Sequence, residues 1–123
     1  MTDQVCVIVG GGKGMAAAIA REMKKRNYRL SLMSPSDNCE NLADELNGIA
    51  YRGRAENSRD TDNLIKFTMK KFGRIDSLLI HVGGPPKGDL LEISEDDWKK
   101  ANEMVLMPVI RFCLLYTSPS PRD

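Results

Sequence analysis

Short apolar runs alternate with longer amphipathic segments along most of the chain. The first run, VCVIV over residues 5–9, is continuous and rich in β-branched residues, which is typical of a strand covered on both faces. Residues 28–33 alternate in polarity like a strand, and residues 49–53 and 76–82 are two further short segments typical of strands. The pattern therefore predicts four short strands.

The segments between these runs have the spacing of helices. Over residues 14–26, small and apolar side chains recur at helical intervals, and the last turn is basic, as the helix dipole favours. Residues 34–48 predict a turn and then a helix, and residues 58–73 predict a longer helix; each ends at its closing glycine. Ser94, followed by three acidic residues, predicts the cap of a further helix that continues toward Cys113.

Strands that alternate with helices imply βαβ crossovers and a parallel sheet. A chain of 123 residues has room for one globular domain of ordinary size and not for a second. We therefore expect an α/β fold in which residues 1–115 form one domain and residues 116–123 form a tail outside it.

Four glycines lie where the first predicted strand turns into the first predicted helix, and Gly10, Gly12 and Gly14 are among them. A helix N-terminus presents unpaired N–H groups and the positive end of its dipole, which suits a phosphate group. Glycine lets the backbone approach that phosphate closely, because no Cβ stands in the way. The turn, with Met15 directly after it, therefore predicts a site for a dinucleotide pyrophosphate; it is not a P-loop, because no GK[ST] closes it.

Composition and charge narrow the class of protein. The chain has 18 Lys and Arg residues against 17 Asp and Glu residues, whereas a dedicated nucleic-acid binder should carry a basic excess. The three cysteines are widely spaced and form no CxxC pair, so the sequence predicts neither a zinc site nor a disulfide framework. The start of the chain does not resemble a signal peptide and no apolar run has membrane-spanning length, so we expect a cytoplasmic protein.

Two segments give the chain a family resemblance. The glycine turn is similar to the TGxxxGxG turn of the short-chain dehydrogenase/reductase family, with Val9 in place of the Thr and Ala16 in place of the last Gly. The segment FGRIDSLLIHVGGPP is similar to the family's GRIDxLVNNAGGPP segment, so that His81, Val82 and Gly83 occupy its Asn-Ala-Gly positions. The resemblance covers roughly residues 5–113.

The family resemblance implies a Rossmann-type, doubly wound parallel sheet, truncated here after the fourth strand and its following helix. It also implies an NAD(P)-dependent oxidoreductase that transfers hydride between the nicotinamide and a carbonyl or alcohol substrate. The family's Ser and Tyr-x-x-x-Lys catalytic residues have no counterpart in the 123 residues, so no catalytic residue is assigned. The alternative hypothesis is a non-catalytic nucleotide-binding module. The resemblance further implies a homo-oligomer for the full-length parent.

Three of the departures from the family pattern bear on cofactor binding and catalysis. Arg54 stands roughly where the family has an Asp that contacts the adenine, which leaves backbone contacts from Ala55 and Glu56 as the expected substitute. Val105 stands near the position of the family's helix-four Asn and cannot replace it. His81 either hydrogen-bonds near the cofactor ribose or lies at a strand end without a role in binding.

The end of the second predicted strand bears on which nicotinamide cofactor binds. An acidic residue there would select NAD, but Ser34 and Ser36 leave this end uncharged. Lys13, just before Gly14, is placed to pair with a 2′-phosphate, although an exposed lysine at a loop tip is the alternative interpretation. The sequence therefore favours NADP over NAD.

The last eight residues, YTSPSPRD, differ abruptly in composition from the helix predicted before them. Alternating Ser and Pro cannot continue a helix, so this tail is interpreted either as foreign sequence or as a disordered terminus. A missing fifth strand would leave the fourth predicted strand as an apolar edge. We therefore expect the 123-residue chain alone to be inactive toward carbonyl substrates and poorly soluble.

Overall fold

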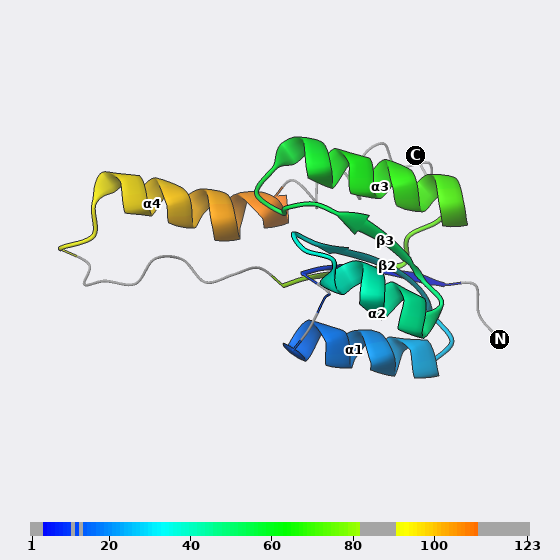
Figure 1. Cartoon of the computed structure of the whole chain (residues 1–123). Helices are drawn as coiled ribbons and strands as arrows, with labels where there is room; N and C mark the ends of the chain where they lie inside the picture. The colour runs from blue at the N-terminus through cyan, green and yellow to red at the C-terminus, as the bar shows by residue number, and fades with distance from the viewer. Residues whose placement is uncertain (1–3, 11, 13, 82–90, 111–123) are drawn as a thin grey trace.

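The computed structural model describes residues 4–10, 12, 14–81 and 91–110. Strands and helices alternate, as the apolar pattern predicts (Figure 1). The strands are β1 (Val5–Val9), β2 (Arg29–Ser34), β3 (Ile49–Arg52) and β4 (Ser77–Ile80). The helices are α1 (Gly14–Lys25), α2 (Asn38–Leu46), α3 (Ser58–Phe72), α4 (Glu95–Ala101) and the π-helical turn η1 (Asn102–Leu106).

The four strands form one parallel sheet in the order β3-β2-β1-β4. In the register of this sheet, Val9 at the end of β1 lies beside Met33 of β2 on one side and beside Ile80 of β4 on the other. The predicted parallel α/β sheet is therefore confirmed, and all four strands end at the same edge.

Helices cover both faces of the sheet, with α1 and α2 on one face and α3 on the other (Figure 1). Alternate residues of β1 supply the two cores: Cys6 and Ile8 pack with α1 and α2, whereas Val7 and Val9 pack with Leu64 of α3. All five residues of β1 are buried, which explains why its sequence is apolar without interruption.

The end of α2 differs in one detail from the prediction. The left-handed residue that closes the helix is Asn47, with φ of 58°, rather than Gly48. Asparagine tolerates this conformation better than most residues. Gly48 is needed for a different reason: a Cβ on it would lie 2.7 Å from the carbonyl oxygen of Leu30 in β2.

The predicted end of α3 at Gly73 and the predicted cap of α4 at Ser94 are present, and Asn57 forms a cap of α3 that was not predicted. Asn57 accepts hydrogen bonds from the first turn of α3, and Gly73 closes that helix with φ of 78°. The Ser94 hydroxyl accepts a hydrogen bond from the backbone N–H of Asp97 at 3.1 Å.

The last predicted helix is not regular along its described length. It begins as α4, away from the sheet, widens into η1 and continues as α-helix to residue 110, running back toward the sheet (Figure 1). The wide turn ends two residues before the buried Pro108, whose ring and missing N–H disfavour regular α-helical geometry over the preceding turn. The tail at 116–123 lies outside the described residues.

Candidate functional site at the carboxyl edge of the sheet

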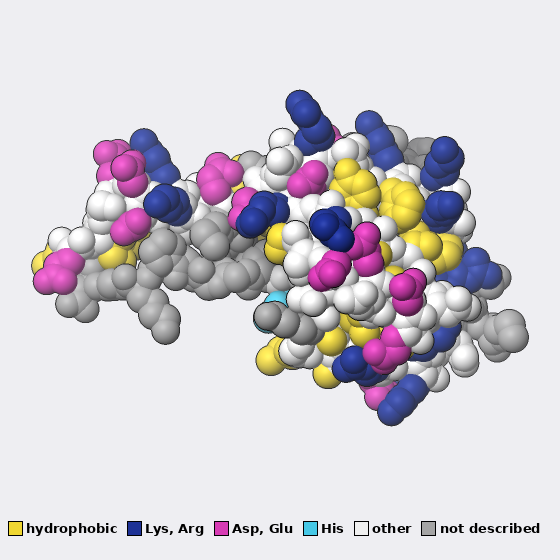
Figure 2. All heavy atoms as spheres, viewed as in Figure 1, with side chains coloured by type: hydrophobic (Ala, Val, Ile, Leu, Met, Phe, Trp, Pro, Cys, Tyr) yellow, Lys and Arg dark blue, Asp and Glu magenta, His cyan; other side chains and the backbone are white. Residues whose placement is uncertain are grey.

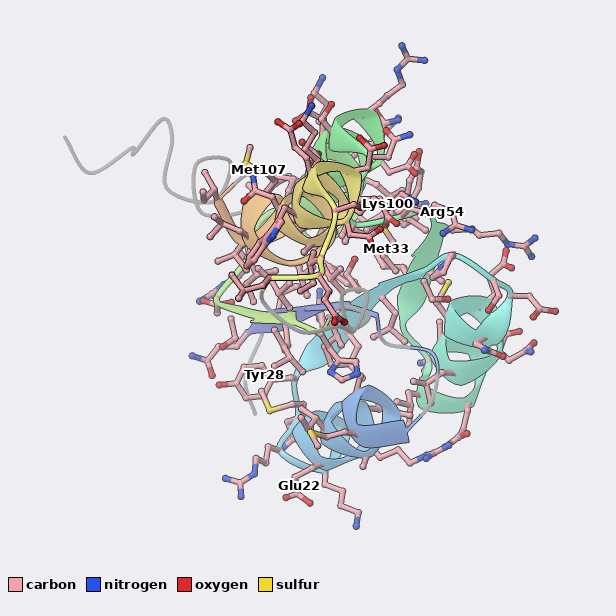
Figure 3. All side chains as sticks on the ribbon, turned by 90° about the vertical axis from the view of Figure 1, so that its left-hand side faces the viewer. Glu22, Tyr28, Met33, Arg54, Lys100 and Met107 are labelled. Carbon is pink, nitrogen blue, oxygen red and sulfur yellow. The ribbon has the colours of Figure 1, made fainter. Side chains whose placement is uncertain are left out.

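Backbone hydrogen bonds hold the ends of the four strands together at one edge, which faces the viewer in Figure 3. Beyond β1, the Gly10 N–H donates to the Met33 carbonyl of β2 at 2.7 Å, and the His81 N–H donates to the Val9 carbonyl at 2.9 Å. Beyond β3, the Gly53 N–H donates to the Ser34 carbonyl at 2.9 Å. In open parallel sheets, ligands bind outside this edge, at the point where the chain order reverses. Here that point lies between β1 and β4.

The three described glycines of the turn have different surroundings. Gly10 has φ of 82°, and a Cβ on it would collide with the carbonyl oxygen of His81. A Cβ on Gly12 would collide with the side chain of Asn38 at the start of α2. Gly14 has φ of 65°, yet a Cβ there would meet no atom within 4 Å. The first two glycines are thus required by packing, whereas Gly14 faces open space at the first position of α1.

The N-terminus of α1 is distinct in charge. Among the four α-helices that the structure describes, α1 alone has no acidic residue in its first turn. The other three carry carboxylates there, at Glu40 in α2, at Asp60 in α3 and at three positions in α4. Because side-chain carboxylates do not occupy the positive end of α1, this end suits an external anion.

The two predicted serines at the end of β2 differ in role. Ser34 is buried, and its hydroxyl donates to the Ser36 carbonyl at 2.9 Å and accepts from the Cys39 N–H at 3.1 Å. Ser36 is exposed, and its hydroxyl accepts from the Asn38 N–H at 3.3 Å. Ser34 therefore fixes the turn into α2, and Ser36 is the serine of the pair that solvent reaches.

The loop after β3 carries the other predicted contacts. Ala55 and Glu56 are partly buried, and the Arg54 guanidinium lies 3.8 Å from the Glu56 carboxylate. The Arg54 backbone N–H donates to a carboxylate oxygen of Asp60 at 2.9 Å. The loop is thus tied to the first turn of α3.

The remaining predicted site residues are exposed or undescribed. His81 lies exposed at the end of β4, and Met15 is 69% exposed at the start of α1. Lys13, Val82 and Gly83 lie outside the described residues.

Two residues at this edge were not singled out from the sequence. Asn38 packs against Gly12, and Asp60 supports the backbone of Arg54. For Asp60 a signal was present: it stands three residues after the helix-capping Asn57, where an acidic side chain commonly reaches back to the preceding loop.

Within the described part of the chain, no three His, Cys, Asp or Glu side chains are placed to hold a metal ion. Over the same residues, no helix has both the length and the apolar character needed to cross a bilayer. Basic and acidic side chains are interspersed over the surface in Figure 2.

Two solved structures share this architecture. YwfH, described as an NADPH-dependent reductase involved in bacilysin biosynthesis, superposes with a TM-score of 0.87 at 16% identity, over 95% of this chain and 49% of that one. Actinorhodin polyketide ketoreductase, solved with NADPH, gives a TM-score of 0.86 at 19% identity, over 95% of this chain and 48% of the other. At these identities the likeness shows the fold.

Sequence comparison shows the family. Oxidoreductase UcpA of Escherichia coli is 34% identical in an alignment 102 residues long, which covers 79% of this chain and 39% of that protein. The chain thus spans less than half the length of this curated relative. The family model for short chain dehydrogenases matches residues 4–118, nearly the whole sequence. The chain belongs to the short-chain dehydrogenase family of oxidoreductases.

Proposed function

We propose that the carboxyl edge of the sheet binds NADP(H), with the pyrophosphate at the N-terminus of α1. One observation carries this proposal: the first residue of α1 is a glycine with open space beside it, on a helix end that has no acidic side chain in its first turn. A phosphate needs close backbone approach, N–H donors and positive potential, and these residues supply all three. When bound, the cofactor would supply the hydride.

We infer that a different part of the cofactor would lie on each side of β1. The adenosine half would lie toward β2 and β3, against Ser36 and the backbone of Ala55 and Glu56. The nicotinamide half would lie toward β4, near His81, Val82 and Gly83. The parallel order β3-β2-β1-β4 supports this division, because β2 and β3 lie on one side of β1 and β4 lies on the other.

NADP is preferred over NAD in this proposal. Ser34 and Ser36 provide no carboxylate at the end of β2 to bind the ribose hydroxyls or to repel a 2′-phosphate. Lys13 would pair with that phosphate as a point charge. The two structural neighbours named above are described as NADPH-dependent or as solved with NADPH.

For the whole protein we propose hydride transfer between the nicotinamide and a carbonyl or alcohol substrate. The 123 residues contain no Tyr-x-x-x-Lys, so this chain by itself would bind cofactor without oxidising it. Subunit contacts of the whole protein would form on α4, which buries none of its own residues and leaves Trp98 49% exposed.

A fluorescence titration with NADPH tests the cofactor site. The unchanged chain should bind NADPH saturably, and Gly14→Val should abolish binding, because its side chain would fill the space of the pyrophosphate. Gly73→Val is the matched control: Gly73 also has a positive φ and open space beside it, but it ends α3, away from the site. Unchanged affinity in Gly14→Val would contradict the proposed site.

A further inference from the structure

The loop between β3 and α3 is held by an interaction that the family resemblance did not indicate. A carboxylate oxygen of Asp60, in the first turn of α3, accepts the backbone N–H of Arg54 at 2.9 Å. Asp60 is partly buried, while Arg54 and the hydrogen bond itself are exposed. A charged acceptor on a backbone N–H makes a stronger bond than a neutral one.

Gly53 allows the Asp60 carboxylate to come this close. A Cβ on Gly53 would lie 2.9 Å from Cγ of Asp60 and 3.0 Å from its Cβ, so a side chain there would push the carboxylate away. The Gly53 N–H in turn donates to the Ser34 carbonyl at 2.9 Å. The last residue of β2, the loop and the first turn of α3 are therefore linked through consecutive residues.

The other end of the loop is fixed as well. The Asn57 N–H donates to the Arg54 carbonyl at 3.1 Å, and the Asn57 side chain accepts from the N–H groups of Arg59 and Asp60. Ala55 and Glu56 lie between these two anchors. Their backbone conformation is consequently set by the Asp60 carboxylate on one side and by Asn57 on the other.

We propose that Asp60 is a positioning residue for cofactor affinity: its carboxylate holds the Arg54 backbone so that Ala55 and Glu56 present their main chain to the adenosine half of NADP(H). The inference rests on the proposed function, because it takes these two residues as part of the cofactor site. Asp60 itself does not touch the cofactor in this account. Its effect passes through the loop.

The test compares two aspartates of the same helix in the 123-residue chain. Asp60→Ala removes the acceptor, whereas Asp62→Ala makes the same charge change at an exposed position two residues later. Affinities for NADPH and for adenosine 2′,5′-bisphosphate are measured by titration, at a temperature where circular dichroism shows each variant folded. We expect Asp60→Ala to weaken both ligands by about tenfold and Asp62→Ala by less than about twofold.

Two further variants separate positioning from folding. Asp60→Asn retains an oxygen that can accept the Arg54 N–H, so it should recover most of the lost affinity. If Asp60→Ala does not fold, Gly53→Ala displaces the same carboxylate from the other side and should give the same loss for both ligands. Equal affinities in the Asp60 and Asp62 variants, or full affinity in a folded Gly53→Ala, would overturn the inference alone. Failure of the unchanged chain to bind NADPH would overturn the proposed function and this inference with it.

Discussion

The carbonyl oxygen of His81, at the end of β4, occupies the space that a side chain on Gly10, at the end of β1, would need. The two residues meet where the chain order of the sheet reverses, and the His81 N–H bonds to Val9 at the same place. Gly10 is therefore required for the close approach of two strand ends. Gly14, in contrast, has open space beside it, on the side where we place the cofactor.

This difference predicts that two alanine variants lose stability by different amounts. Gly10→Ala should lower the free energy of unfolding by about 2 to 4 kcal/mol, because it adds a steric clash to the cost of a positive φ. Gly14→Ala should lower the free energy of unfolding by only about 1 to 2 kcal/mol, because a positive φ is its sole cost. It should also weaken NADPH binding. Urea denaturation and NADPH titration of both variants measure the two effects. Equal stability losses would contradict the assigned packing role of Gly10.

Cofactor selectivity should depend on Lys13. We expect the unchanged chain to bind NADPH more tightly than NADH, and Lys13→Glu to narrow or reverse the difference by removing a partner of the 2′-phosphate. Lys24→Glu makes the same charge change at the other end of α1 and should leave the ratio of the two affinities unchanged. If NADPH and NADH bind with equal affinity both before and after the change at Lys13, this residue does not contact the 2′-phosphate.

Asp76 should make stability pH-dependent at the opposite edge of the sheet. Hydrogen bonds from Arg74, and then one from the Val5 N–H, lower the pKa of the Asp76 carboxyl below its ordinary value. A carboxyl with a lowered folded-state pKa stabilises the fold above its unfolded pKa of about 3.9, and this contribution is lost as the pH falls through the folded pKa.

Comparison with Asp76→Asn measures this contribution, because the amide oxygen can still accept the Val5 N–H but carries no charge for Arg74. Asp76→Asn should be less stable by about 1 kcal/mol or less between pH 5 and pH 7, since the ion pair is partly exposed. The difference should shrink below about pH 4. Chemical denaturation across this range measures it, and a difference that grows on acidification would contradict the assignment.

The buried thiols should be unreactive in the folded chain. Burial raises the pKa of the Cys6 thiol to about 11, and Cys39, in the first turn of α2, is fully buried. In a Cys113→Ser background, a disulfide reagent at pH 8 should therefore react with Cys6 and Cys39 only as fast as the chain unfolds. Adding urea should accelerate both reactions together. A thiol that reacts at once in the native chain would show that Cys6 or Cys39 is accessible to the reagent without unfolding.

The order of the strands and helices was predictable because each is indicated by residues that are close together in the sequence. The apolar run at 5–9 and the glycine turn after it fix a strand, a turn and a helix N-terminus from neighbouring residues alone. The caps at Asn57 and Ser94 are likewise local, since each side chain bonds to a residue at most three positions away. Of these, the Ser94 cap and the acidic turn after it were predicted.

What the sequence did not indicate depends on contacts between distant segments. That Gly48 must be glycine follows from the Leu30 carbonyl in another strand, and that Ser34 is buried follows from the start of α2 folding over it. The link between Asp60 and Arg54 depends on the conformation of the loop between them. Periodicity and composition carry no information about such approaches.

The binding of NADPH at the carboxyl edge is tested most directly by residue-resolved amide chemical shifts. In a titration of the isotope-labelled 123-residue chain with NADPH, the largest changes should fall on Gly10, Gly12, Gly14, the loop at 55–56 and His81. Amides near Gly48 and Asp76, at the opposite edge, should change little. Saturable changes confined to that opposite edge, or no saturable change anywhere, would contradict the account.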